Sequence, residues 1–343
     1  MPYLEFGCRA TVIGSMPHTD PAEACAQVSR YLKDIPAWPQ LPKRAFRENM
    51  YAQFSEGFPG VVIEEDKIFV DRSQDLDKPL EKLYAAYLDN DFDKYPTSAE
   101  YAAGLHSFLS LTNLSPLAVK GQVTGPVTWG LSVADDSRRA IIYDDVLGDT
   151  VAKLLRLKAS WQEKALSQIS KNTIIFVDEP YMQFYGSSSF ITLSREKISS
   201  LLEEVFSGIS GLKGIHCCGN TDWPILLETS TDIASFDTYN YAQSLSLYPA
   251  EVKKFLDRKG TIAWGIVPND EESLAKETVA SLKDRLEEAM APFTRKGIRF
   301  KQLIEQGLLT PNDGLGAIAT EEAAARVLEL LVELSAAIRK RYM

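Results

Sequence analysis

The segment from Gly214 to Asn220 carries an imidazole and a thiol two residues apart, at the end of a short apolar run. In a β-strand, residues i and i+2 point to the same face, so His216 and Cys218 share one side while Cys217 points to the other. Imidazole nitrogen and cysteine thiolate are both good zinc ligands. Two ligands are also compatible with a buried cysteine beside a hydrogen-bonded histidine, so a metal site requires further ligands from elsewhere in the chain.

Short apolar runs alternate with longer amphipathic segments, which is the pattern of repeated βα units around a parallel sheet. The eight runs expected to form strands are Ala10–Ser15, Ile35–Leu41, Leu117–Thr124, Thr173–Asp178, Lys213–Cys217, Asp232–Asp237, Thr261–Val267 and Gly307–Thr310. The segments expected to form helices include Pro21–Leu32, Ser137–Ser170, Ser194–Phe206, Pro249–Arg258, Glu271–Ala291 and Glu321–Arg341. This order predicts the α/β class and a single (β/α)8 TIM barrel. The rival fold, a doubly wound open sheet, would need a Gly-x-Gly-x-x-Gly turn after the first strand, and residues 13–17 do not provide one.

Two regions exceed a minimal barrel and are predicted to be insertions after the second strand. Glu56–Arg72 contains two short apolar runs, which indicate a β-hairpin over one mouth of the barrel, and Tyr84–Asn113 indicates additional helix. The sequence has no internal repeat, no low-complexity tract and no linker rich in Pro, Gly or Ser. We therefore expect one barrel domain over residues 1–343, with an insertion at about 56–113.

Composition and charge exclude several classes of partner. The 343 residues carry a net charge of −10, and no basic patch is interleaved with aromatic residues, so we expect neither nucleic acid nor an anionic membrane as a partner. The sequence has no apolar run of about 18 residues and no charged-then-apolar leader, so we expect a cytoplasmic protein without a membrane span. The four cysteines do not form a spaced disulfide framework, and we expect reduced thiols.

Polar residues follow most of the expected strands. In a (β/α)8 barrel the chemistry lies at the carboxyl ends of the strands, so these residues are the candidates for a site. They are Ser15 and His18 after the first strand, Thr124, Asp178 and Glu179, His216 and Cys218, Asp237, and Asp313 after the last. Each has a structural alternative: a carboxylate at a strand end can cap a helix, Asp313-Gly314 can form a turn, and Gly14 can serve backbone geometry or the close approach of a ligand.

Six motifs occur in the order seen in one known family. They are Ile13–Pro17, Val123–Thr128, Asp178–Pro180, His216-x-Cys218, Asp237-Thr238 and Pro311–Leu315. In this arrangement the chain resembles, over nearly its whole length, the catalytic barrel of cobalamin-independent methionine synthase in a short, core-only form. The same superfamily contains uroporphyrinogen decarboxylase and the zinc methyltransferases that take methyl groups from corrinoid proteins. The resemblance implies Zn2+-dependent transfer of a methyl group to a small thiol such as homocysteine, with a methyl-folate or a methyl-corrinoid protein as the donor.

The resemblance also implies roles for individual residues. His216, Cys218, Asp237 and Asp313 would bind the metal, with Asp313 standing where the family has a second cysteine. The metal would deprotonate the acceptor thiol, since a zinc-bound thiol is a thiolate. The acceptor and donor would contact Ile13, Gly14, Ser15, Asp178, Glu179, Thr124 and Trp129, and the candidates for catalysis are Asp178 and His18.

The chain departs from the family between Lys43 and Met50, a segment that is glutamate-rich in the family and basic here. Arg44 or Arg47 would therefore face an acidic group of a substrate or lie in solvent. Two alternatives stay open. The first is a barrel of the decarboxylase type that acts on a carboxylated substrate through arginines such as Arg9, and the second is a non-catalytic barrel whose metal site is degraded and which binds a partner.

Overall fold

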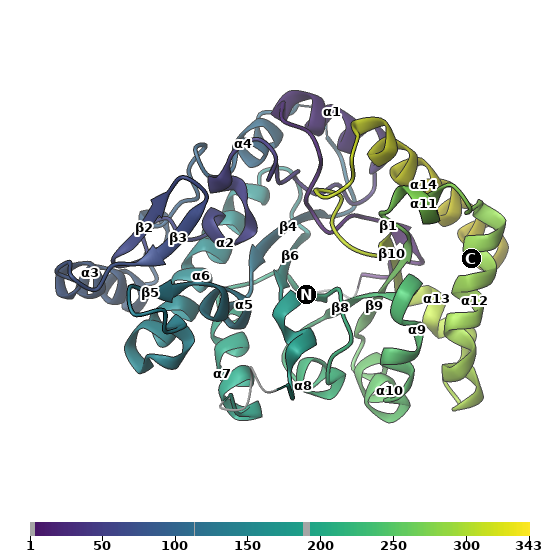
Figure 1. Ribbon diagram of the computed structural model, residues 1–343. Coiled ribbons are helices and arrows are strands. Elements are labelled where there is room, and N and C mark those ends of the chain that lie inside the picture. Colours follow the sequence, from purple (N-terminus) through teal and green to yellow (C-terminus); the bar gives the residue numbers. More distant parts are fainter. Residues whose placement is uncertain (1–3, 113, 188–192) are drawn as a thin grey trace.

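The computed structural model describes residues 4–112, 114–187 and 193–343, and it is built around one curled parallel sheet (Figure 1). The seven strands of this sheet, in spatial order, are β1 (Arg9–Ala10), β10 (Gly307–Pro311), β9 (Thr261–Val267), β8 (Ile233–Asp237), β7 (Leu212–Cys217), β6 (Thr173–Asp178) and β4 (Val119–Thr124). All six pairings between neighbours are parallel. The predicted α/β class with a curled parallel sheet is confirmed.

The second expected strand, residues 35–41, forms no regular ladder. It bridges the two edges of the sheet through isolated parallel pairings of Ala37 with Lys120 and of Gln40 with Ser15. The physical reason lies in its sequence, because prolines at 36, 39 and 42 have no N–H group to donate to a neighbouring strand. The prediction of a full strand over residues 35–41 is therefore corrected to two isolated pairings. The predicted first strand is shorter than expected, because β1 ends at Ala10 and beyond it Ser15 forms one isolated pairing.

The predicted hairpin is present as a small separate sheet. Its strands β2 (Val61–Glu64) and β3 (Lys67–Val70) are antiparallel, and β3 also pairs with β5 (Ala134–Asp135). This sheet and helix α3 project together on one side of the molecule (Figure 1). Asn113, the last residue of the predicted insertion, lies outside the described residues.

The described residues form the following helices, most of which lie on the outer side of the curled sheet, whereas α3 projects beside the small sheet (Figure 1). They are α1 (Pro21–Tyr31), α2 (Met50–Gln53), α3 (Asp77–Leu88), α4 (Ala103–Leu109), α5 (Pro126–Ser132), α6 (Asp145–Leu166), α7 (Arg195–Phe206), α8 (Trp223–Leu227), α9 (Thr238–Ser246), α10 (Pro249–Asp257), α11 (Glu271–Leu274), α12 (Val279–Arg295), α13 (Phe300–Glu305) and α14 (Glu321–Tyr342). The 3-10 turns are η1 (Phe46–Glu48), η2 (Phe92–Lys94), η3 (Ile141–Tyr143) and η4 (Pro180–Phe184). None of the helices in the described residues is long and apolar enough to cross a membrane.

Two expected helices differ from the structure for local reasons. The segment expected as one helix from residue 271 is split into α11 and α12, because Thr278 and Ser281 form a capping box that starts a new helix. Helix α6 starts later than expected, where the Asp144 side chain accepts hydrogen bonds from the amides of Val146 and Leu147.

The strands alternate their side chains between two cores. Ile175 and Val177 of β6 belong to the large cluster between sheet and helices, whereas Ile174 and Phe176 belong to a smaller cluster on the inner face of the curl. Asp178 continues the inner series at the carboxyl end of the strand, as the period of two requires. The inner face of the sheet is therefore apolar along the strands and polar at their carboxyl ends.

Candidate metal centre

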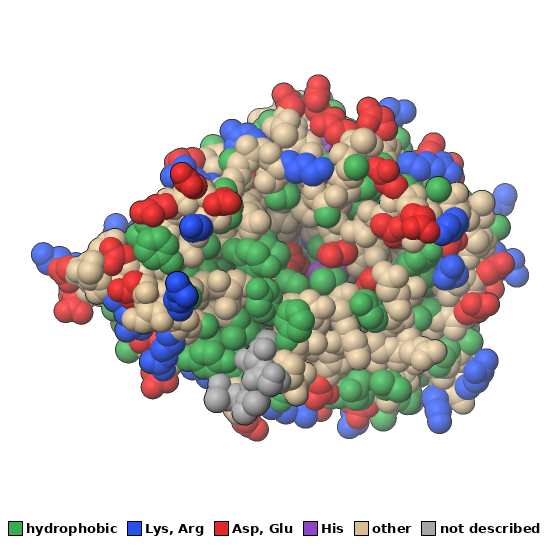
Figure 2. All heavy atoms as spheres, in the orientation of Figure 1, with side chains coloured by type: hydrophobic (Ala, Val, Ile, Leu, Met, Phe, Trp, Pro, Cys, Tyr) green, Lys and Arg blue, Asp and Glu red, His purple; other side chains and the backbone are tan. Residues whose placement is uncertain are grey.

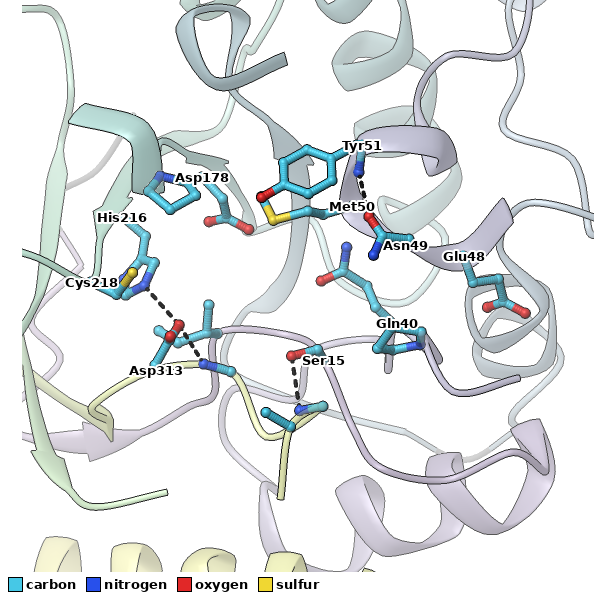
Figure 3. A pocket seen from close by; sticks show the side chains of 16 residues that line it. Ser15, Gln40, Glu48, Asn49, Met50, Tyr51, Asp178, His216, Cys218 and Asp313 are labelled. Atoms are coloured by element: carbon cyan, nitrogen blue, oxygen red, sulfur yellow. Dashed lines mark hydrogen bonds and ion pairs between the residues drawn. The ribbon is translucent and has the colours of Figure 1, made fainter. Parts of the chain in front are cut away.

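A cavity of about 470 Å³ opens at the carboxyl ends of the strands. One wall consists of Asp178 at the end of β6, His216 in β7, Cys218 directly after β7, and Asp313 in the loop after β10 (Figure 3). Figure 2 shows the opening as a hollow with histidine and acidic side chains at its bottom and hydrophobic side chains along one border. The parallel order of the strands brings these residues together from positions far apart in the sequence.

His216, Cys218 and Asp313 form the candidate metal group. One potential ligand atom from each residue lies within 4.8 Å of the other two, and His216 Nε2 is 3.5 Å from Asp313 Oδ1. The Nδ1 atom of His216 lies 3.0 Å from the Ser235 hydroxyl, which fixes the orientation of the ring. Nε2 is buried and has no hydrogen-bond partner within the described residues. An oriented imidazole whose second nitrogen is left unpaired beside a thiol and a carboxylate is the arrangement that a metal ligand requires.

The electrostatics of the group depend on burial and on the two acids. Burial, and then the nearby Asp313 carboxylate, raise the pKa of the Cys218 thiol above its usual range. Burial also acts to raise the pKa of Asp313, but the contacts with His216 and the Gly314 amide outweigh it and hold this pKa below its ordinary value. Without a cation, the group therefore holds a protonated thiol beside an ionised carboxylate.

The donor set fits zinc. Ligand bonds of about 2.0–2.3 Å in a tetrahedral arrangement place neighbouring donor atoms roughly 3.3–3.8 Å apart, and the His216–Asp313 separation of 3.5 Å lies in that range. A tetrahedral ion held by these three residues would have a fourth position for a substrate. The carboxylate of Asp313 makes this donor set harder than one with a second thiolate, which shifts its preference away from soft metals.

Asp237 does not belong to the group of three. Its carboxylate accepts hydrogen bonds from the Asn240 amide at 2.8 Å, from the Asn240 side chain at 2.7 Å and from the Asn312 side chain at 3.2 Å. Burial raises its pKa, and these hydrogen bonds act to lower it. The structure thus places Asp237 as the cap of helix α9, and its predicted role as a ligand is not supported by this geometry.

The loop after β1 lines the cavity with Ile13 and Ser15. Gly14 between them is required by close packing, because a Cβ atom there would lie 2.6 Å from Gln122 Cδ and 2.7 Å from Gln40 Oε1. The Ser15 hydroxyl accepts a hydrogen bond from the Gly316 amide at 3.1 Å. This loop is therefore held rigidly against the loop that carries Asp313.

Asp178 and Glu179 are neighbours with different environments. Asp178 lines the cavity, its Oδ1 has no hydrogen-bond partner within the described chain, and burial raises its pKa to about 6. Glu179 points away from the cavity and accepts hydrogen bonds from the amides of Val127 and Thr128 and from the Thr128 hydroxyl, at 2.6–2.9 Å. Burial raises the pKa of Glu179 to about 7, although these hydrogen bonds act to lower it. Asp178 is therefore available to a ligand, whereas Glu179 fixes the start of helix α5.

Three other predicted residues lie outside the cavity lining. Thr124 donates a hydrogen bond to the Met50 carbonyl at 2.5 Å, and Trp129 donates one to the Tyr51 carbonyl at 2.8 Å. Thr124 and Trp129 therefore hold helix α2, which lines the cavity, in its position. His18 is buried elsewhere, with Nε2 2.7 Å from Gln27 Oε1, so its predicted catalytic role is not supported by its position.

The wall opposite the metal group was not predicted. It consists of Gln40, Pro42, Glu48, Asn49, Met50 and Tyr51 (Figure 3). The Glu48 side chain is fully buried, lies 2.6 Å from Arg44 Nη1, and has one oxygen, Oε2, without a hydrogen-bond partner in the described residues. Arg47 instead pairs with Glu100 at 2.9 Å. The segment that looked basic in sequence thus contributes an acid, Glu48, to the lining, with its carboxylate directed away from the metal group (Figure 3), and neither Arg44 nor Arg47 lines the cavity.

The fold is similar to those of two solved structures. A protein from Listeria monocytogenes, provisionally described as a vitamin-B12-independent methionine synthase, matches with a TM-score of 0.58 at 15% identity over 93% of this chain and 86% of that one. A methyltransferase from Methanosarcina mazei matches with a TM-score of 0.55 at 13% identity over 97% of this chain and 94% of that one. No family model and no curated protein sequence matches the chain. At these identities the likeness concerns the fold, and at that level the predicted resemblance is confirmed.

Proposed function

We propose that the chain is a zinc-dependent methyltransferase whose acceptor is a small thiol, with homocysteine as the first candidate. The observation that carries this proposal is the unpaired, buried Nε2 of His216 beside Cys218 and Asp313. The likeness in fold to a methyltransferase and to a provisionally described methionine synthase supports it. In this interpretation the curled sheet is a (β/α)8 barrel in which residues 35–41 take the place of the second strand.

His216, Cys218 and Asp313 would hold the metal, and bound zinc would supply a lowered pKa for the thiol of the acceptor. Ser235 keeps the His216 ring in place through Nδ1. Asp178, with a free carboxylate oxygen at the cavity, would bind the amine of the acceptor, and the rigid loop of Ile13 and Ser15 would position its carbon chain. The acceptor thiol would lose its proton to solvent on binding, and its sulfur would form a bond to the methyl carbon while the bond between the methyl group and the donor breaks, its electron pair leaving with the donor.

The opposite wall provides a surface for the donor. Met50 and Tyr51 give this otherwise polar wall an apolar and aromatic part, and the Tyr51 ring lies edge-on to Tyr181 with the ring centres 6.2 Å apart. An aromatic surface of this kind suits a flat donor such as a methyl-folate or the corrin of a methyl-corrinoid protein. Both remain candidates for the donor.

The decarboxylase alternative finds less support in the structure. Arg9 pairs with Asp34 at 2.9 Å, and no arginine or lysine is among the lining residues of the cavity within the described chain. A site for a carboxylated substrate would need such cations. The non-catalytic alternative depends on whether Asp313 holds metal, which the following experiment decides.

The test is the metal content of protein purified without added metal or chelator, measured by mass spectrometry for the wild type, Cys218→Ser and Asp313→Ala. Cys217→Ala serves as the matched control, because this neighbouring thiol is buried in the cluster between sheet and helices. We expect near-stoichiometric zinc in the wild type and the control, and loss of zinc in the other two variants. Zinc-loaded wild type should then alkylate homocysteine with a methyl donor. Absence of metal from the wild type after zinc is supplied would refute the proposal, and metal retained by Asp313→Ala would favour a degraded site.

A further inference from the structure

A second cavity, of about 540 Å³, lies in the inserted region and shares no lining residue with the first. It lies between the first turns of helix α3 and the end of the η2 turn. Lys78 and Lys82 come from α3, and Lys94 and Tyr95 come from η2 and the residue after it. Two separate elements therefore direct cationic side chains to one cavity.

Two of the three lysines around this cavity have no ion-pair partner among the described residues. Lys78 and Lys82 are four residues apart on one helix, and neither forms an ion pair with a carboxylate of the described residues, whereas Lys94 pairs with Asp91 at 2.8 Å. Like charges at this spacing destabilise a helix. The chain as a whole has a net charge of −10, so the local cluster does not reflect a basic protein.

Glu56 is the acidic residue of the lining, and it is already engaged. Its Oε2 atom accepts a hydrogen bond from the Ser98 amide at 2.9 Å and lies 3.6 Å from the Nζ atom of Lys158, whose side chain is fully buried. The negative charge of Glu56 is therefore compensated by Lys158 and does not neutralise Lys78 and Lys82.

Tyr95 supplies the observation that is independent of the lysines. It lines the cavity, is only 6% exposed, and its hydroxyl has no hydrogen-bond partner within the described residues. Its ring packs on Gly57, where a Cβ atom would lie 3.1 Å from the ring. Burial raises the pKa of Tyr95, so the phenol keeps its proton and remains a donor. The side chain is thus largely buried, and its hydroxyl, which no group of the described residues engages, is available to a ligand in the cavity.

The helix itself adds to the positive potential. Helix α3 has 12 residues, and its N-cap residue Leu76 provides no side-chain acceptor for the amides of the first turn. Lys78 and Pro79 of that turn line the cavity. The positive end of the helix dipole acts in the same direction as the ammonium groups, and it is opposed in part by Asp77 of the first turn and by Asp75, which accepts a hydrogen bond from the Asp77 amide at 3.1 Å.

We propose that this cavity binds a phosphate-class oxyanion, either as the free ion or as the terminal group of a small metabolite. A phosphate monoester carries a charge of about −1.5 to −2 at pH 7 and three strong acceptor oxygens. This matches three ammonium groups and one free hydroxyl better than a single carboxylate does. The site is independent of the proposed methyl transfer, and so is its test.

The test uses isothermal titration of the full chain at low ionic strength with inorganic phosphate, glycerol 3-phosphate and acetate. The variants are Lys78→Gln/Lys82→Gln, whose sites are exposed, and Tyr95→Phe, which keeps the ring on Gly57. The matched control is Lys254→Gln/Lys296→Gln, which removes the same charge from exposed positions outside the cavity. We expect saturable binding of one phosphate group per chain, at least tenfold weaker in the lysine variant, several-fold weaker in Tyr95→Phe and unchanged in the control.

The two phosphate ligands distinguish the sources of the anion. Tighter binding of glycerol 3-phosphate would identify a phosphorylated metabolite, and equal binding would identify the free ion; both support the site. No saturable binding, or equal weakening in the lysine variant and the control, would indicate an adventitious ion only and overturn the proposal. Acetate binding as tightly as phosphate would overturn the assignment of the ligand class.

Discussion

Lys120 offers the sharpest test of the electrostatics under the candidate site. Its side chain is fully buried on the inner face of the sheet, and Nζ donates hydrogen bonds to the Ile13 carbonyl at 2.5 Å and to Gln122 Oε1 at 3.2 Å. Nζ also lies 4.2 Å from the centre of the Phe176 ring. Burial lowers the pKa of Lys120 to about 8, although the Asp178 charge acts in the opposite direction.

The size of the effect follows from the two pKa values. The ordinary value is 10.5 and the folded value about 8, and at about 1.4 kcal/mol per pH unit the difference is ~3 kcal/mol. Between these values the unfolded chain keeps a proton that the folded chain has released. The free energy of unfolding should therefore rise with pH in this window, whereas below pH 8 the folded state carries the full cost of the buried charge.

The perturbation is Lys120→Met, which keeps most of the side-chain volume and removes the titration. Urea unfolding of both proteins in a chelating buffer, from pH 7 to 10.5, gives the difference in their free energies of unfolding. We expect the wild type to gain ~3 kcal/mol relative to the variant across this range. The chelator removes any contribution from a bound metal.

Lys254→Met is the control, because Lys254 is exposed and its removal should leave the difference from wild type nearly flat over the same pH range. A flat difference for Lys120→Met as well, within about 1 kcal/mol, would refute the reasoning. It would mean that the hydrogen bonds to Ile13 and Gln122 compensate the ammonium fully.

Three further predictions address the site and its supports. Because its raised pKa keeps the Cys218 thiol protonated at pH 7, zinc binding should release about one proton per metal ion. Calorimetry in buffers of different ionisation enthalpy measures this release, and its absence would mean that the thiol is not a ligand. Glu179→Ala should lower the free energy of unfolding by ~2–4 kcal/mol, since it leaves two buried amides of helix α5 without an acceptor; urea unfolding measures this loss, and Glu179→Gln should recover part of it. In a double-mutant cycle, Arg44→Met and Glu48→Gln should show a coupling of ~1 kcal/mol; strictly additive effects would contradict the ion pair.

His216 and Cys218 could be found from the sequence because strand periodicity places them on one face, whereas Asp313 was assigned through the resemblance to a known motif. His216 lies inside and Cys217 outside β7, since successive side chains alternate, and Cys217 is indeed part of the outer core cluster. Asp178 continues the inner face of β6 for the same reason. The carboxyl ends of parallel strands share one edge of the sheet, so Asp178 and His216 meet there, whereas the position of Asp313 depends on the loop after β10.

Residues next to helix starts were harder to assign, because a carboxylate there has a competing use. Glu179 and Asp237 both follow or end a strand, and both are used by the amides of the helix nearby. A helix leaves its first amides unpaired, and a nearby carboxylate satisfies them at little cost. Sequence order shows that a carboxylate is near the site, but it does not show whether the carboxylate caps a helix or binds a ligand.

The wall around Glu48 could not be predicted, because the chain between residues 42 and 55 has no strong period. It is made of a 3-10 turn and the four residues of helix α2. The position of α2 is set by tertiary hydrogen bonds, from Thr124 to the Met50 carbonyl and from Trp129 to the Tyr51 carbonyl. The available signal was local, namely Asn49 as an N-cap before an apolar residue.

The charge of the cavity argues for an acceptor that carries an amine. Glu48, Asp178 and Asp313 all line it, whereas no lysine or arginine of the described residues does. A divalent metal at Asp313 still leaves two acids, one of them paired with Arg44. We therefore expect zinc-loaded protein to bind homocysteine at least about tenfold more tightly than 4-mercaptobutyrate, which lacks the amine, and Asp178→Asn to remove most of that preference in a calorimetric titration. Equal affinities in the wild type would show that neither acid meets the amine, and the acceptor would then have to be sought among thiols without one.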